Sequence, residues 1–210
     1  MTYHADLQAA LIKWLGKDKV VFLPGWDKKY RGIGWYGKHQ KPVAMVCHHT
    51  AGANTDSTNP DHPGNQRGAN QGVITYVAKK FSAPASNFVL DRDGTVYVTT
   101  AYPCWHCGEG SFKGVPPYSS LGVADDRGHD FMLGVEVVDK GIGKTFTSAQ
   151  KWSLGNLANA CKEASGWRGL WKRLPNHTTW AGRRKVDTRY SLSTLRLWAA
   201  RAAAKRTFSA

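Results

Sequence analysis

The stretch Val-Ala-Met-Val-Cys-His-His-Thr-Ala-Gly, residues 43–52, joins an apolar run to a pair of histidines. The run from Val43 to Cys47 predicts a short buried strand that presents His48 at its carboxyl edge. Side chains alternate along a strand, so His48 and His49 point to opposite faces and one of them at most is a metal ligand. A histidine at a strand end is most often structural, but the small Thr-Ala-Gly sequence that follows leaves space above the strand. This space favours a binding role for His48.

A second polar cluster lies near the carboxyl end, in Asn-His-Thr-Thr-Trp-Ala-Gly-Arg-Arg-Lys-Val-Asp at residues 176–187. His177 and Asp187, taken with His48, form two imidazoles and a carboxylate, which is the protein ligand set of a catalytic zinc with a fourth position left for water. Structural zinc fingers use ligand pairs a few residues apart. Here the first ligand is far from the other two in sequence, so a complete fold must bring them together.

Lys185 lies two residues before Asp187, and on an extended segment both side chains project to one face. An ammonium beside the metal would stabilise the oxyanion that forms when activated water attacks a carbonyl. The alternative is a solvated charge run, Arg183 to Lys185, with Asp187 as its surface counter-ion. The local sequence favours neither interpretation.

Glu136 interrupts an otherwise apolar run, Leu-Gly-Val-Glu-Val-Val at residues 133–138. An ionised carboxylate is costly to bury unless it is paired or functional. Near a metal it would accept a proton from water, as a general base does. The alternative is that Glu136 faces solvent on a half-buried strand.

The remaining patterns predict an α/β domain with one mixed sheet. Apolar spacing predicts helices at 5–15 and 73–81, the latter with Val73, Tyr76, Val77 and Phe81 on its apolar face. Asp-Gly between two apolar runs predicts a hairpin over 87–98. Thr147 and Gln150 form a capping-box pattern before a helix. We further expect strands at 43–47 and 132–138, irregular chain at 24–41, a polar loop at 52–69, mostly loop at 101–130, a last short strand or its approach at 170–174, and a basic helix at 191–206 with Leu192, Leu195 and Ala199 inward and Arg201, Lys205 and Arg206 outward.

Six segments occur in one order over residues 43–190: V-C-H-H-T-A-G, S-N-F-V-L-D-R-D-G-T-V-Y, W-H-C-G, L-G-V-E-V-V, T-S-A-Q and H-x7-K-x-D. In this set and order the chain resembles the zinc-dependent N-acetylmuramoyl-L-alanine amidases of the type 2 class, which share a fold with the peptidoglycan recognition proteins. The resemblance implies a single α/β domain with a central mixed sheet flanked by helices.

The same resemblance implies that His48, His177 and Asp187 bind Zn2+, that Glu136 is the general base, and that Lys185 is the oxyanion partner. The implied reaction is hydrolysis, by zinc-activated water, of the amide between N-acetylmuramic acid and L-alanine of the peptidoglycan stem peptide.

Three further residues take expected roles from the same likeness. Some short phage amidases carry a catalytic Tyr on the hairpin strand, where this chain has Ser86 and Asn87, so no Tyr role carries over and Asn87 is expected to contact substrate. Trp105 and His106 match the family's W-H-x-G segment, which borders the substrate groove, and are also expected to contact substrate.

The net charge of +14 is unevenly placed. Residues 1–41 carry 8 Lys and Arg against 3 Asp and Glu, residues 42–140 carry 7 against 10, and residues 141–210 carry 14 against 2. Basic ends favour an anionic polymer, either cell wall or nucleic acid, over a merely solvated surface. We expect a basic N-terminal extension packed on the core (1–41), a catalytic domain (42–190) and a basic C-terminal helix (191–210).

No helix-turn-helix, zinc-finger or RNA-recognition pattern supports specific nucleic-acid binding. The four cysteines give no disulfide framework, and whether Cys104 and Cys107 pair stays open. No secretory signal or membrane span is expected from the sequence. We therefore expect synthesis in a host cytoplasm and action on the cell wall after release, as in a phage endolysin. A catalytically silent peptidoglycan-binding module is the alternative, although such a module would be expected to lose a zinc ligand.

Overall fold

The computed structural model describes residues 2–28, 41–143, 145–185, 187–188 and 190–207. A five-stranded mixed sheet lies at its centre, with strand order β1-β4-β3-β5-β2. Its strands are β1 (Val20–Phe22), β2 (Ala44–His49), β3 (Phe88–Leu90), β4 (Val96–Val98) and β5 (Met132–Val137). β3 and β4 pair antiparallel and the other neighbours are parallel, which confirms the predicted α/β class with a mixed sheet.

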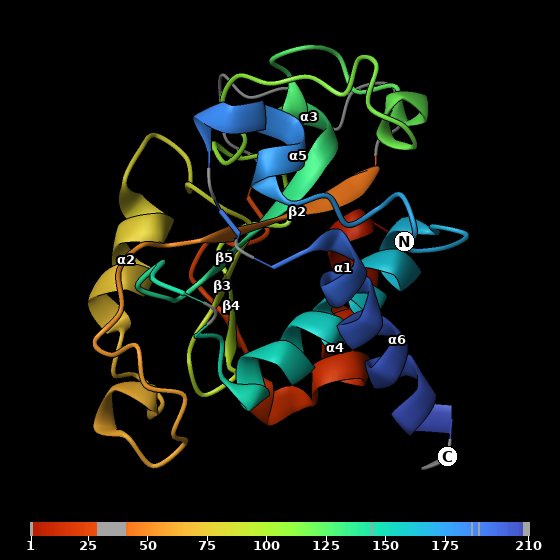
Figure 1. Ribbon diagram of the computed structural model, residues 1–210. Helices are drawn as coiled ribbons and strands as arrows, with labels where there is room; N and C mark the ends of the chain where they lie inside the picture. Colours follow the sequence, from red (N-terminus) through yellow and green to blue (C-terminus); the bar gives the residue numbers. More distant parts are fainter. Residues whose placement is uncertain (1, 29–40, 144, 186, 189, 208–210) are drawn as a thin grey trace.

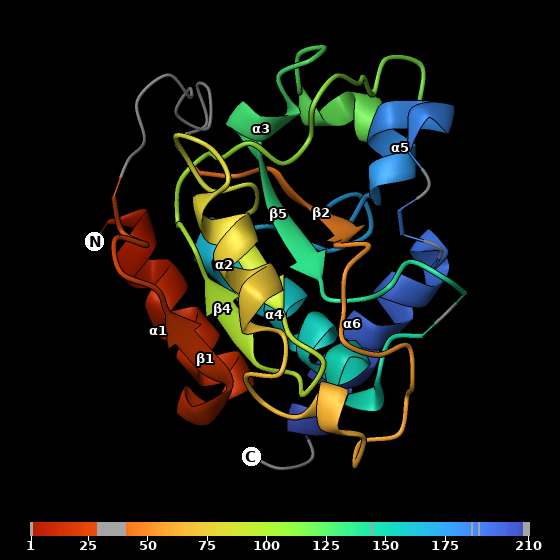
Figure 2. The same ribbon diagram turned by 90° about the vertical axis from the view of Figure 1, so that its left-hand side faces the viewer.

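Helices cover both faces of the sheet (Figures 1 and 2). One face carries α1 (Tyr3–Leu15), α4 (Ser148–Ser165) and α6 (Leu192–Thr207), which share one apolar core with the strands. The other face is covered by α2 (Gln71–Lys79), whose Ile74 and Val77 pack on Val89 and Tyr97. Shorter helices are α3 (Gly128–Phe131) and α5 (His177–Ala181), with 3-10 turns at Lys17–Lys19, Pro63–Asn65, Tyr118–Leu121 and Gly182–Arg184.

β1 was not predicted, and it makes the N-terminal segment part of the sheet. Its three residues pair in parallel with β4 at the sheet edge. A strand this short has too little alternation to be recognised from sequence, and tertiary pairing stabilises it. The described part of residues 1–41 therefore contributes an edge strand as well as a helix packed on the core. Residues 29–40 of the predicted irregular segment lie outside the described residues.

Two local predictions are confirmed in atomic detail. Asp91 to Gly94 form the hairpin turn, in which the Gly94 amide donates to the Asp91 carbonyl over 3.0 Å and Gly94 has φ +86°. A Cβ on Gly94 would also lie 2.9 Å from Ser153 Oγ in α4, so glycine is required there. Thr147 and Gln150 form the reciprocal capping box that begins α4.

One other prediction needs correction. Tyr76 and Phe81 are expected on the apolar face of their helix, but both are exposed and line a cleft, and Phe81 lies beyond the end of α2. Of the two alternatives for residues 170–174, the approach to a strand is the one found. Residues 171–173 form a turn, and the carbonyls of Arg173 and Pro175 then accept from the amides of Met45 and Cys47 in β2.

The C-terminal helix has the predicted orientation. Leu195 and Ala199 are buried, and Leu192 is half-buried against the core. Arg201 and Lys205 are exposed, while the side chain of Arg206 lies outside what the structure describes. None of the helices in the described parts of the chain has the length and apolar content that a membrane span requires.

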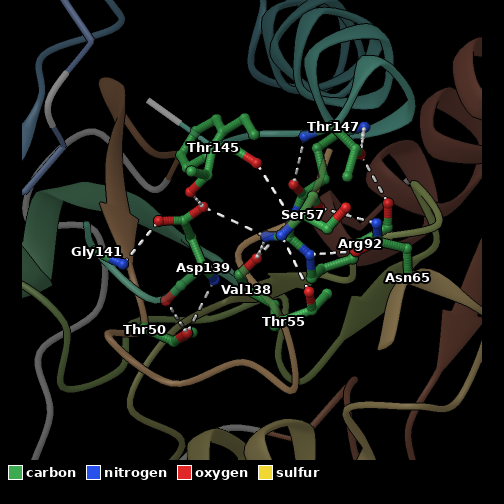
Figure 3. A network of polar contacts seen from close by, with 12 residues as sticks. Thr50, Thr55, Ser57, Asn65, Arg92, Val138, Asp139, Gly141, Thr145 and Thr147 are labelled. Atoms are coloured by element: carbon green, nitrogen blue, oxygen red, sulfur yellow. Dashed lines mark hydrogen bonds and ion pairs between the residues drawn. The ribbon is translucent and has the colours of Figure 1, made fainter. Parts of the chain in front are cut away.

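A buried arginine joins the loops on one side of the sheet (Figure 3). Arg92 donates from Nε to Asn65, from Nη1 to the Val138 carbonyl and Asp139, and from Nη2 to the carbonyls of Ser57 and Thr145. All five N–H groups of the guanidinium thus have acceptors. The Asp139 carboxylate, 3.3 Å from Nη1, also accepts from Thr145 Oγ1 and the Gly141 amide. This network fixes the chain that follows β2 to the chain that follows β5.

Candidate metal centre

Three elements bring the predicted ligands together. β2 ends with His48 and His49, and α5 begins at His177, where Asn176 caps the helix by accepting from the Thr179 amide. Asp187 lies beyond the 3-10 turn that follows α5, where its carbonyl accepts from the Thr178 amide. Far-separated segments therefore converge at the carboxyl ends of the parallel strands β2 and β5, on the side where ligands of open α/β sheets commonly bind.

The three ligand atoms face one another. His48 Nδ1 is 2.9 Å from His177 Nδ1, His177 Nδ1 is 2.9 Å from Asp187 Oδ2, and His48 Nδ1 is 3.4 Å from the same oxygen. Tetrahedral zinc with bonds of about 2.0–2.1 Å would place its ligand atoms about 3.3 Å apart. Both imidazoles aim Nδ1 at the same carboxylate oxygen, so one oxygen and two nitrogens surround one point. The donor set and its spacing fit Zn2+.

The electrostatics of the ligands favour a cation as well. Burial lowers the pKa of His48 to about 4, against the opposing hydrogen bond with Asp187, so the imidazole is neutral at pH 7. Burial alone would raise the pKa of Asp187, but hydrogen bonds with His177 and His48 hold it well below its usual range. Asp187 is paired with the two imidazoles. The alternative, in which Asp187 is a surface counter-ion of the basic run before it, therefore does not describe its position.

Glu136 lies beside this centre on β5, opposite His48 in the pairing of β2 with β5. Its Oε2 atom is enclosed and has no hydrogen-bond partner among the described residues. Burial and the charge of Asp187 raise the pKa of Glu136 to about 8, while Lys185 and Lys80 oppose that rise. Glu136 is half-buried, with Oε2 enclosed and the side chain bordering a cleft beside Asp187 and Lys185, which makes it a candidate functional group.

A cleft of about 530 Å³ opens over the centre. His177, Asp187, Glu136 and Lys185 line it, so the predicted base, the oxyanion partner and two of the three predicted ligands border one space. His49, which follows His48, also lines it. The cleft is thus the place where a substrate carbonyl would meet these groups.

The three expected substrate contacts take different positions. Trp105 is partly exposed at the cleft, with its ring tilted against His129. His106 borders the cleft but is buried, and its two ring nitrogens face His48 Nε2 over 3.3 Å and the Met132 carbonyl over 2.9 Å. Asn87 does not line the cleft.

Asn87 is fully buried in the scaffold. Its amide donates to the carbonyls of Thr100 and Tyr102, and its oxygen accepts from the Gly134 amide. With its amide nitrogen and oxygen engaged, its position argues against the expected substrate contact. Asn87 instead fixes β5 to the loop after β4.

Several cleft residues were not predicted from the sequence. α2 and the residues after it contribute Tyr76, Lys80 and Phe81, with Lys80 Nζ 4.6 Å from the centre of the Tyr76 ring. In the sequence, the feature that could have indicated them is the pair of large aromatic residues Tyr76 and Phe81. Cys107 is also close to the centre, because its carbonyl accepts from His177 over 3.1 Å. All four cysteines are free and buried, so Cys104 and Cys107 are unpaired in this structure.

Residues 38–189 match the protein-family model described as N-acetylmuramoyl-L-alanine amidase. This match covers most of the chain, and the protein belongs to that family. No curated protein sequence matches it.

Solved structures with the same fold come from several sources. A selenomethionine derivative of AmpD is 17% identical, with a TM-score of 0.55 over 86% of this chain and 94% of that one. The endolysin amidase LysCS from Clostridium intestinale is 15% identical, with a TM-score of 0.52 over 85% and 93%. The Ph2119 endolysin of a Thermus scotoductus bacteriophage is 17% identical, with a TM-score of 0.50 over 86% and 98%. At these identities the likeness establishes the fold.

Proposed function

We propose that this protein is a zinc-dependent peptidoglycan hydrolase that cleaves the amide between N-acetylmuramic acid and L-alanine of the stem peptide. The observation that supports it best is the convergence of His48, His177 and Asp187 within 3.4 Å of one another, beside the enclosed carboxylate of Glu136. The family of the chain supports the bond that is cut.

Zn2+ would be held by His48 Nδ1, His177 Nδ1 and Asp187 Oδ2, where it would polarise the amide carbonyl and lower the pKa of a water molecule. The protein supplies the rest of the chemistry. Two neutral imidazoles and one carboxylate leave a net positive charge on the loaded centre, which favours an approaching carbonyl oxygen.

Glu136 is the proposed general base. Its carboxylate takes the proton from the attacking water and delivers it to the nitrogen of the leaving L-alanine, so that a neutral amine departs. The pKa of about 8 belongs to a site without a cation, and a dication on the neighbouring ligands lowers it towards the range in which a base is ionised. The tuning of Glu136 therefore depends on the occupied centre.

Lys185 is the proposed oxyanion partner. It is exposed and lines the same cleft as Glu136, which supports this role. As the carbonyl becomes tetrahedral its oxygen gains negative charge, and the ammonium stabilises it more than it stabilises the ground state.

The cleft wall offers stacking and anion recognition for the substrate. Trp105, Tyr76 and Phe81 are exposed aromatic residues that line the cleft, and aromatic side chains suit sugar rings and apolar peptide side chains. Lys80 and Arg184 add positive charge to the lining of the same cleft, which suits the carboxylates of a stem peptide.

A digest of purified peptidoglycan tests the proposal. The zinc-loaded protein should release new L-alanine amino groups without new reducing sugar ends, and a chelator should abolish the release. Glu136→Gln, which still binds zinc, is the matched control for contaminating hydrolases and should be inactive. New reducing ends would contradict the proposal. Wall binding without cleavage would identify a silent peptidoglycan-binding module, and tight sequence-specific DNA or RNA binding would identify a nucleic-acid protein.

We also propose a lysis role, in which the protein is made in a host cytoplasm and reaches the wall after release. Similar structures titled endolysins, the basic C-terminal helix and the anionic nature of cell walls support it. Cells that produce the protein should lyse only when their membrane is permeabilised. A protein that leaves such cells intact but cleaves soluble muropeptides would instead have a remodelling role.

A further inference from the structure

The two histidine ligands are held from behind in different ways. His177 points Nδ1 at the centre, and its opposite nitrogen, Nε2, lies 3.1 Å from the Cys107 carbonyl. His48 also points Nδ1 at the centre, but no carbonyl of the described residues is hydrogen-bonded to its Nε2. It lies 3.3 Å from Nδ1 of His106, whose own Nε2 is 2.9 Å from the Met132 carbonyl.

A carbonyl oxygen can only accept a hydrogen bond, and this sets the donor and acceptor in both series of hydrogen bonds, the one behind His177 and the one behind His48. His177 must carry its proton on Nε2, which leaves Nδ1 bare. His106 must likewise carry its proton on Nε2, and its buried ring contacts His48, the Met132 carbonyl and Cys107, none of them a carboxylate that would favour a second proton. Its Nδ1 is then an acceptor for the proton on His48 Nε2. His48 is left with a bare Nδ1 facing Asp187 and His177.

We propose that His106 is a positioning residue. It donates from Nε2 to the Met132 carbonyl and accepts at Nδ1 from His48 Nε2, and so holds His48 in the tautomer that binds the metal through Nδ1. We call these two hydrogen bonds the relay. This inference rests on the proposed zinc site. It replaces the expected role of His106 as a substrate contact with a role behind the ligand. Partners behind a metal-bound histidine commonly change metal affinity by about 10- to 100-fold.

Gly134 in β5 leaves the space that the His106 ring occupies. A Cβ on Gly134 would lie 2.6 Å from Cγ and 2.7 Å from Nδ1 of His106, so any side chain at this position would displace the ring. The His106 ring is buried and meets the His48 ring edge-on at 5.5 Å between centroids. The Gly134 amide is in turn held by Asn87 Oδ1 over 2.8 Å. Asn87 and Gly134 thus support the ring that supports the ligand.

Cys107 offers a competing arrangement. Its Sγ is 3.0 Å from His106 Nδ1, and His48, His106 and Cys107 together form a second group of ligand atoms within 4.8 Å. A thiol that donated to His106 Nδ1 would leave His48 Nε2 without an acceptor. Cys107→Ala removes this donor and this ligand while His106 stays, and is therefore the control that separates the relay from a second metal site.

The test measures zinc affinity by chelator competition and the tautomers of 15N-labelled histidines in the metal-free protein. His106→Phe, which keeps a ring but has no nitrogen, should weaken zinc binding about 10- to 100-fold. His106→Gln, whose amide offers one acceptor and one donor, should restore part of the loss. Cys107→Ala should bind zinc as the native protein does. His48 should carry its proton on Nε2.

Unchanged affinity in folded His106→Phe, or a proton on Nδ1 of His48, would overturn the relay. Loss of zinc in Cys107→Ala equal to that in His106→Phe would overturn it in favour of the second group of ligands. A native protein that binds no zinc at all would instead remove the proposed function, and the tautomer measurement, made without metal, would still decide the proton position.

Discussion

Two buried polar clusters in this molecule differ in how fully their hydrogen-bonding groups are satisfied. Around Arg92, all five guanidinium N–H groups have acceptors and both Asp139 oxygens have donors. Around His48, two imidazole nitrogens face each other over 2.9 Å, and Glu136 Oε2 has no partner among the described residues. Buried polar groups without partners cost stability. The first cluster is complete in itself, whereas the second has open positions that fit the proposed zinc site.

We expect the two clusters to have separate roles, one in metal binding and chemistry and the other in stability. Substitutions in the His48 cluster should remove metal binding or chemistry and leave the fold stable. Substitutions in the Arg92 cluster should remove stability and leave the chemistry of the folded molecules intact. Each of the following changes is a way to break this division.

His177→Ala should have the largest effect. Loss of a ligand removes several kcal/mol of transition-state stabilisation, which lowers kcat/KM by about 10⁴-fold or more. Amide release from peptidoglycan and zinc content by elemental analysis measure the two losses. A His177→Ala protein that keeps zinc and activity would place the metal elsewhere.

Glu136→Gln should lower kcat by roughly 10²- to 10⁴-fold, because the general base is lost while the ligands remain. Zinc content and KM should change little. Steady-state kinetics on a defined muropeptide separates kcat from KM. Full activity with zinc bound would refute the assigned base.

Arg92→Met should destabilise the fold by about 3–5 kcal/mol, since it leaves the Asp139 carboxylate buried and unpaired. Denaturant unfolding measures the loss. Zinc affinity and kcat of the folded protein should stay close to native, and adding Asp139→Asn to Arg92→Met should recover part of the stability. If Arg92→Met lost zinc affinity but kept native stability, the Arg92 cluster would have a role in metal binding, and the separation of roles would be wrong.

In the metal-free protein, the stability difference between the native chain and Glu136→Gln should change with pH between about 5 and 8, with Glu136 contributing less stability as pH rises. The pKa of Glu136 is raised by burial to about 8 in the folded state, so the folded state binds a proton there that the unfolded state releases. The slope from this group is about 1 kcal/mol per pH unit near pH 7, and it must be taken as a difference because burial lowers the pKa of His48, His106 and His129, which gives an opposing slope in both proteins. Glu136→Gln is the control and should lack this slope. Identical pH profiles would show that the carboxylate is not buried as described.

Neutralising Arg201 and Lys205 with glutamine should have the smallest effect. Both are exposed on α6, whereas Leu195 and Ala199 hold the helix in the core, so a deletion of the helix would damage the fold. Binding to purified cell walls should fall roughly two- to five-fold per charge at low salt, and the difference should vanish at high salt. A loss that persists at high salt would point to packing instead of charge.

Sequence patterns predicted most elements because their signals are local. The Asp-Gly turn after β3, the capping box of α4 and the apolar runs of β2 and β5 each depend on neighbouring residues. β1 depends on its partner β4, and three residues carry no period. The apolar spacing of the helix also could not show whether Tyr76 faces the sheet or the cleft, because that depends on what packs against the helix.

The three proposed ligands come from sequence motifs, but the arrangement behind them could not be predicted in this way. His106 appeared as part of the groove because its motif borders it, while its partners, His48 and the Met132 carbonyl, come from strands far away in sequence. Asn87 appeared available for substrate, yet folding engages it with backbone groups on two segments. Hydrogen bonds between distant segments leave no periodic signal, so only the fold reveals them.

Anomalous scattering at the zinc edge, from crystals of the zinc-loaded protein, tests the central claim most directly. We expect one strong peak per chain, about 2.0–2.1 Å from the Nδ1 atoms of His48 and His177 and within bonding distance of Asp187. A peak bound to His106 and Cys107, or no ordered peak in protein that hydrolyses peptidoglycan, would contradict it.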